Sequence, residues 1–217
     1  MAITQLQIYN KALLLVGERA LSSLTEDREP RYLLDQLWNI EDEVTTCLEE
    51  GQWRFAMRAI KIDYDPRVAE PSFGYHRAFL KPADWVLTSA VCSDEFFRMP
   101  LTQYFDERGY WWAEIDTIYV RYVSNDPAWG KNMALWPNSF QDYVGADLAA
   151  RVALKIVDDE KRLEVMLKIA AQAKRKAKSR AAMSDATVWE AQGSWTRARQ
   201  RWLGRKDGGN TSGNLIG

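Results

Sequence analysis

The segment Thr117-Ile-Tyr-Val-Arg-Tyr-Val123 alternates in a way that is typical of a β-strand. Ile118, Val120 and Tyr122 would lie on one face, because successive side chains of a strand point to opposite sides. Working outward, strand patterns also occur at residues 60–64, 85–92, 96–101 and 110–114. The pairs Asp65-Pro66 and Glu70-Pro71 break the chain between them. The sequence therefore predicts a small antiparallel sheet within residues 59–135.

On both sides of this region the apolar residues recur at helical spacing. We expect helices at about residues 4–16, 29–50 and 139–157, and a fourth that begins at Asp158-Asp159 and ends near Met183. Thr4 is a suitable N-cap for the first, and Gly17 a suitable stop. The core stripe of the second consists of Leu33, Leu37, Ile40, Val44 and Leu48. The expected fold is α+β and mainly α: a four-helix bundle (1–58 and 136–183) with an inserted small antiparallel β subdomain (59–135) and an extended C-terminal tail (184–217).

Aromatic residues are dense in the expected β subdomain: Trp85, Phe96, Phe97, Tyr104, Phe105, Tyr110, Trp111 and Trp112. A small sheet needs large side chains to bury enough surface. Some of these aromatics could instead form an exposed contact patch. Trp53 and Phe55, which follow the second helix, are expected to plug the end of the helical core.

The formal net charge of −1 conceals a strong asymmetry. Residues 1–160 carry 16 basic and 26 acidic side chains, whereas residues 161–206 carry 13 basic and 3 acidic ones. This asymmetry suggests a partner with a complementary field, although a solvated charged helix would give the same count. The basic, Trp-rich residues 184–217 are expected to order on a partner or to be a disordered terminus.

Several function classes lack their usual sequence signals. No apolar run is long enough for a transmembrane helix, and the N-terminus does not resemble a signal peptide, so we expect a protein made in a cytoplasm. Cys47 and Cys92 are outside metal-ligand spacings and are expected to be buried small hydrophobes, and His76 is the single histidine. Acidic pairs such as Glu49/Glu50 do not face one another on a helix. We expect no enzyme activity, no cofactor and no metal.

An ordered series of segments resembles the head–tail adaptor family of podovirus-type bacteriophages, the tail tubular protein A-like connectors. The series covers residues 4–183 and includes Ile8-Tyr-Asn-Lys-Ala-Leu-Leu-Leu-Val-Gly-Glu18, Leu21-Ser-Ser-Leu24, Gly51-Gln-Trp-Arg-Phe-Ala56, Phe79-Leu-Lys-Pro-Ala-Asp84, Ile118-Tyr-Val-Arg-Tyr-Val123, Trp136-Pro-Asn-Ser-Phe140 and Leu148-Ala-Ala-Arg-Val-Ala-Leu154. The resemblance implies a structural protein of the virion neck, assembled in the host cytoplasm. It also implies a ring of twelve copies that binds the portal and the distal, nozzle-type tail protein. Genomic DNA would pass through the ring without specific binding.

Within that expectation, the charge asymmetry suggests separate tasks for the two ends of the chain. An acidic body suits a channel wall, because a negative wall does not hold DNA phosphates. The basic tail would bind the portal, and the expected portal-binding residues are Trp189, Trp195, Arg197, Arg199, Arg201 and Trp202. The alternative function is a nucleic-acid-binding module that uses the basic C-terminal helix and tail.

Overall fold

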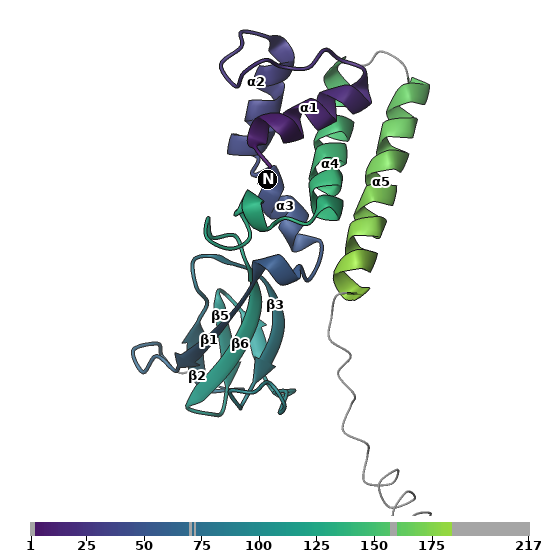
Figure 1. The fold of residues 1–217 in the computed structure, drawn as a ribbon. Coiled ribbons are helices and arrows are strands. Elements are labelled where there is room, and N and C mark those ends of the chain that lie inside the picture. The colour runs from purple at the N-terminus through teal and green to yellow at the C-terminus, as the bar shows by residue number, and fades with distance from the viewer. Residues whose placement is uncertain (1–2, 70, 72, 157–159, 184–217) are drawn as a thin grey trace, which may run out of the picture. The chain divides into compact units, whose positions relative to one another are not determined.

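A computed structural model describes residues 3–69, 71, 73–156 and 160–183, and Figure 1 shows their arrangement. Residues 1–184 form one compact unit, in which the helices lie together at one end and the strands at the other. The helices are α1 (Gln5–Val16), α2 (Glu29–Asp35), α3 (Glu43–Glu49), α4 (Asn138–Ile156) and α5 (Glu160–Met183). The short turns are the π-helical η1 (Gln36–Ile40) and the 3-10 helices η2 (Arg54–Ala56) and η3 (Met133–Leu135).

The six strands form two three-stranded antiparallel sheets. The strands are β1 (Met57–Asp63), β2 (Arg77–Leu80), β3 (Trp85–Cys92), β4 (Phe105–Glu107), β5 (Tyr110–Ala113) and β6 (Thr117–Ser124). One sheet has the order β1-β6-β3, and the other has the order β2-β5-β4. β6 is central in the first sheet, with Ile60 opposite Val120 and Val91 on its other side.

The expected four-helix bundle with one small inserted sheet is therefore wrong. The described residues form five α-helices and two sheets. The expected helix at 29–50 is divided by the π-turn and by Asp42, whose φ of 47° lies in the left-handed region. As a result Ile40, expected in the core, is 79% exposed. The expected strand at 96–101 is also wrong: residues 93–98 form turns, and only the bridge between Cys92 and Pro100 remains.

The limits of α1 are confirmed. The Thr4 hydroxyl accepts a hydrogen bond from the Gln7 amide, and the Gln7 side chain accepts one from the Thr4 amide, which completes a capping box. Gly17 ends the helix at φ 88°, a conformation that is cheap only for glycine. The start expected for the last helix, at residues 158–159, lies outside the described residues.

The helical core extends to sheet β1-β6-β3, through Val123 of β6, Met57 of β1 and Leu87 of β3. It joins α1, α3 and α4 through side chains such as Leu13, Leu48 and Val144, and Trp53 is buried among them. The Trp53 ring meets the Phe140 ring edge-to-face, with centroids 4.8 Å apart, and its indole N–H donates to the carbonyls of Cys47 and Leu48 at the end of α3. Trp53 thus closes this end of the core, as expected. None of the helices in the described part of the chain has the length and hydropathy needed to cross a membrane.

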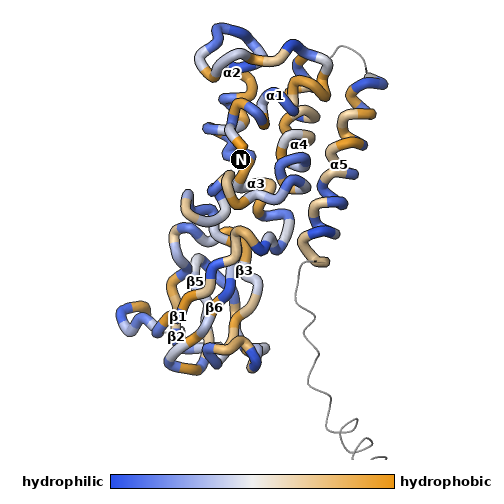
Figure 2. The backbone as a smooth tube through the Cα atoms, in the orientation of Figure 1, coloured by the Kyte–Doolittle hydropathy of each residue, from blue (hydrophilic) through white to orange (hydrophobic). Residues whose placement is uncertain are grey.

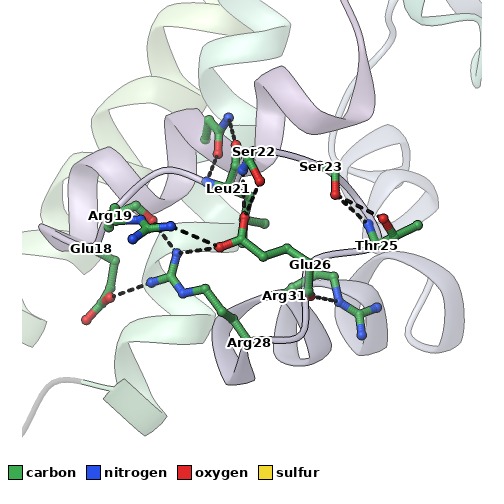
Figure 3. Close-up of polar contacts among 10 residues, drawn as sticks. Glu18, Arg19, Leu21, Ser22, Ser23, Thr25, Glu26, Arg28 and Arg31 are labelled. Atoms are coloured by element: carbon green, nitrogen blue, oxygen red, sulfur yellow. Dashed lines mark hydrogen bonds and ion pairs between the residues drawn. The ribbon is translucent and has the colours of Figure 1, made fainter.

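The loop between α1 and α2 is held by one carboxylate. Figure 3 shows Glu26 accepting hydrogen bonds from the amide and hydroxyl of Ser22, while Arg19 and Arg28 lie beside it. These hydrogen bonds and charges lower the pKa of Glu26. The loop between α1 and α2 is exposed, but these contacts hold it in one conformation and so fix the start of α2.

Candidate functional site: an exposed aromatic face

The outer face of sheet β2-β5-β4 carries large apolar side chains that no other element covers fully. Directly opposite residues of an antiparallel pair point to the same side of a sheet. In the register of this sheet, Ala78 and Phe105 flank Trp112, and Leu80 and Glu107 flank Tyr110. Trp112 and Tyr110 therefore share one face, while Trp111 and Ala113 on the opposite face are buried.

This aromatic face, defined by Tyr75, Leu80, Phe105, Tyr110 and Trp112, is open to solvent. Leu80 and Phe105 are each 56% exposed, and the other three side chains are half-buried. The rings contact one another: the centroids of Tyr75 and Phe105 are 4.9 Å apart, and those of Tyr110 and Trp112 are 6.0 Å apart. Aromatic side chains are enriched at the centres of protein–protein interfaces, so this face is suited to contact another protein.

The opposite face of the same sheet explains why the aromatic face is rigid. Trp111 is fully buried, and its indole N–H donates to Thr88 of β3, which belongs to the other sheet. Lys81 reaches over the ring of Trp85 at 3.5 Å and also pairs with Asp106 of β4. The two sheets thereby hold each other, and the exposed rings lie on a fixed platform.

A buried polar cluster lies at the contact of α3 with α4. Glu43 is fully buried, Cys47 donates to its Oε1 at 3.9 Å, and Asp147 is its acidic neighbour. The Nε–H of Arg151 is donated to Asp147 at 3.2 Å. Glu43 Oε2 lies 3.0 Å from the same Nε but accepts no hydrogen bond. Burial, the hydrogen bond with Asp147 and the negative charge of Asp147 together raise the pKa of Glu43 to about 8.

This cluster is a possible metal donor set by distance alone, since the ligand atoms of Glu43, Cys47 and Asp147 lie within 4.8 Å of one another. Its chemistry fits a metal poorly. Arg151 already supplies the positive charge, and burial raises the pKa of the Cys47 thiol far above its usual range, whereas a metal needs the thiolate. We interpret the cluster as a structural joint between α3 and α4.

The residues expected to bind the portal cannot be compared with these features. Trp189, Trp195, Arg197, Arg199, Arg201 and Trp202 all lie outside the described residues. Of the aromatics for which an exposed contact patch was left open as an alternative, Phe105 and Phe96 are exposed, whereas Trp111 is in the core. Tyr75 and Leu80 were missed, because only pairing with β5 and packing against β4 bring them to that face. Cys47 and Cys92 are buried as expected.

Figure 2 shows that hydrophilic and hydrophobic residues alternate along α5. The side chains of Arg175 and Lys176 on α5 are exposed, and Lys174 and Lys178 pair with Glu50 across to the end of α3. No known protein-family model matches the chain, and no curated protein matches it.

Proposed function

We propose that this chain is a structural subunit of a tailed-bacteriophage virion, a head–tail adaptor that joins the portal to the distal tail protein in a ring around the DNA path. The ordered resemblance over residues 4–183 supports this proposal. The structural observation that supports it is the aromatic face on sheet β2-β5-β4, an exposed apolar surface of the composition that protein contacts use.

The two partners are assigned to different parts of the chain. The aromatic face receives the distal tail protein, because its centre is apolar and its rim carries both charge signs, including Glu107 and Arg108. The basic C-terminal residues, with Trp189, Trp195, Arg197, Arg199, Arg201 and Trp202, bind the portal. This assignment makes the two interactions separable by mutation.

The experiment measures binding of the full chain to purified portal and distal tail proteins of the same phage. Leu80→Ser with Phe105→Ser should abolish binding to the tail protein and leave portal binding intact. Leu14→Ser is the matched control, because Leu14 is 78% exposed but lies on α1. Deletion of residues 190–217 should abolish binding to the portal and leave binding to the tail protein intact. The proposal fails if the unaltered chain binds neither protein, and the assignment of the aromatic face fails if the double variant binds the tail protein normally.

A nucleic-acid-binding module remains the second candidate, and the favouring observation is the basic composition of α5. Glu160–Met183 holds eight basic and two acidic residues. Lys168 pairs with Glu164, and both Lys174 and Lys178 pair with Glu50. This use of charge favours a structural role for part of the helix. A DNA mobility shift that weakens steeply with salt would favour the second candidate.

A further inference from the structure

Two outward faces of the helical layer differ in charge and both expose apolar side chains. The α5 outer face consists of the exposed residues Lys161, Val165, Lys168, Arg175 and Lys176. The α2 outer face consists of the exposed residues Glu29, Tyr32, Gln36, Ile40 and Glu41, which lie on α2, on the π-turn and just after it. The α5 outer face is basic, although Lys168 already pairs with Glu164 on the same helix. The α2 outer face carries the carboxylates of Glu29 and Glu41, of which Glu41 also pairs with Arg151 of α4 at 3.6 Å. The two faces therefore have charges of opposite sign.

These two faces lie on opposite sides of the layer. α4 packs against α5 on one side and against α1 and α2 on the other, and Figure 1 shows α2 and α5 at the two sides of α1 and α4. A contact between two such faces on different copies is heterologous, and repetition of a heterologous contact closes a ring when its rotation is suitable. A two-fold contact would instead set like charges against each other on either face, which is unfavourable.

Each face exposes one aliphatic side chain among its charged residues. Ile40 is 79% exposed, and it stands on a π-turn, a feature that often occurs at functional sites. Val165 is also exposed, close in the helix to Lys161 and Lys168. An isoleucine and a valine within complementary charged rims have the composition of a protein interface, apolar at the centre and polar at the edge.

We propose that the α5 outer face of one copy packs against the α2 outer face of the next copy, and that this is the lateral contact of the ring. The inference rests on the proposed adaptor function for its biological setting, but the contact is a property of the chain itself. The basic side chains of α5 lie against Glu29 and Glu41, while Val165 and Ile40 are shielded from water between them.

A charge-swap pair tests the contact in the full-length chain. Variant A carries Lys168→Glu, Arg175→Glu and Lys176→Glu, which leaves Lys161 as the one basic residue among three carboxylates and makes the α5 outer face acidic. Variant B carries Glu29→Lys and Gln36→Lys, which makes the α2 outer face basic. Each alone places like charges at the contact, and we expect the self-association constant to fall at least about tenfold for each. Mixed in equal amounts, A and B again offer opposite charges at every contact.

The expected result is that A and B assemble only together, in species that contain equal numbers of each and are visible by native mass spectrometry. Light scattering follows assembly of each chain alone and with portal, and circular dichroism verifies that each variant is folded. Arg67→Glu with Glu95→Lys, both exposed in the β region, is the control and should leave assembly unchanged. Ile40→Ser should also weaken assembly without any change of charge.

Other outcomes overturn the contact. Assembly of A alone or B alone at the level of the unaltered chain, or failure of the folded mixture to assemble, rejects this pairing of faces. A chain that forms no oligomer either alone or with portal also rejects it. These results are separate from the adaptor proposal: if binding to portal and tail protein persists while the swaps have no effect, the adaptor function stands and this contact is wrong.

Discussion

The replacement Glu43→Gln should make the protein more stable, and the gain should depend on pH. Glutamine has the shape of a protonated glutamate, and its amide can donate to Asp147. In the unfolded chain Glu43 ionises near its ordinary pKa of 4.5, whereas in the folded protein its pKa is about 8. Between these values the folded state holds one more proton than the unfolded state. The free energy of unfolding therefore decreases as pH rises from about 4.5 to about 8, and it changes no further above that range.

The magnitude follows from the width of that interval. Each pH unit costs about 1.4 kcal/mol while the unfolded state alone is ionised, so burying Glu43 costs on the order of 3 kcal/mol at pH 7 and 5 kcal/mol above pH 8. Glutamine avoids this cost but loses the attraction of Arg151, whose Nε lies 3.0 Å from Glu43 Oε2. We expect a net gain of about 1–3 kcal/mol at pH 8.5 and almost none at pH 5.

Urea unfolding followed by tryptophan fluorescence at pH 5, 7 and 8.5 measures these differences. Glu49→Gln is the matched control, because Glu49 is on the same helix but exposed. Its difference in stability from the unaltered protein should be the same at pH 7 and at pH 8.5. A difference between Glu43→Gln and the unaltered protein that is the same at all three pH values would refute the reasoning. It would mean that Glu43 is ionised in the folded state and held as an ordinary ion pair by Arg151.

Two further substitutions test the β region. Asp84 accepts hydrogen bonds from Arg58, Tyr122 and Ser124; burial opposes its ionised form, but these bonds outweigh burial and lower its pKa. Asp84→Asn should lower the free energy of unfolding, measured in urea, by about 2 kcal/mol at pH 7. This loss should shrink as pH falls below 3.8, because the carboxylate of the unaltered protein then takes up a proton. An equal loss at pH 3 would contradict this reasoning. Gly130→Ala should cost about 2 kcal/mol or more, because the new Cβ would lie 2.0 Å from the Ser124 carbonyl oxygen. Gly145→Ala is the control, because its new Cβ would lie 3.4 Å from the nearest atom, the Lys11 Cβ, and its melting temperature should be unchanged. Equal melting temperatures of the two variants would exclude the close approach at Gly130.

Local signals in the sequence were sufficient for α1 but not for the segment that follows it. Thr4 and Gly17 act on their own neighbours, so their roles could be predicted without the rest of the molecule. The π-turn at Gln36–Ile40 and the left-handed Asp42 have no comparable signal, since neither contains glycine or proline. Asp42 is held there by distant Lys131 and by Thr45, each at 2.8 Å. A contact across 89 positions cannot be read from local periodicity.

The pairing of the strands into two sheets could not be predicted from the alternation of residues either. Alternation identifies strand residues such as Ile118 and Val120, but it does not say which strands pair. Between Tyr110 and Trp112 three aromatics follow one another, so the apolar pattern does not indicate which face is buried. Only packing decides this, because the Trp111 indole reaches Thr88 on the other sheet.

The break between α2 and α3 connects the two features of greatest interest in the helical layer. In a regular helix Ile40, Val44 and Cys47 would share one face, because residues three and four apart are neighbours. Here Val44 and Cys47 are buried and Ile40 is exposed, so the phase of the chain changes between residues 40 and 43. The same change that places Ile40 on the α2 outer face seats Glu43 against α4 beside Arg151. One change of helical phase therefore accounts both for the exposed Ile40 side chain and for the buried Glu43 carboxyl.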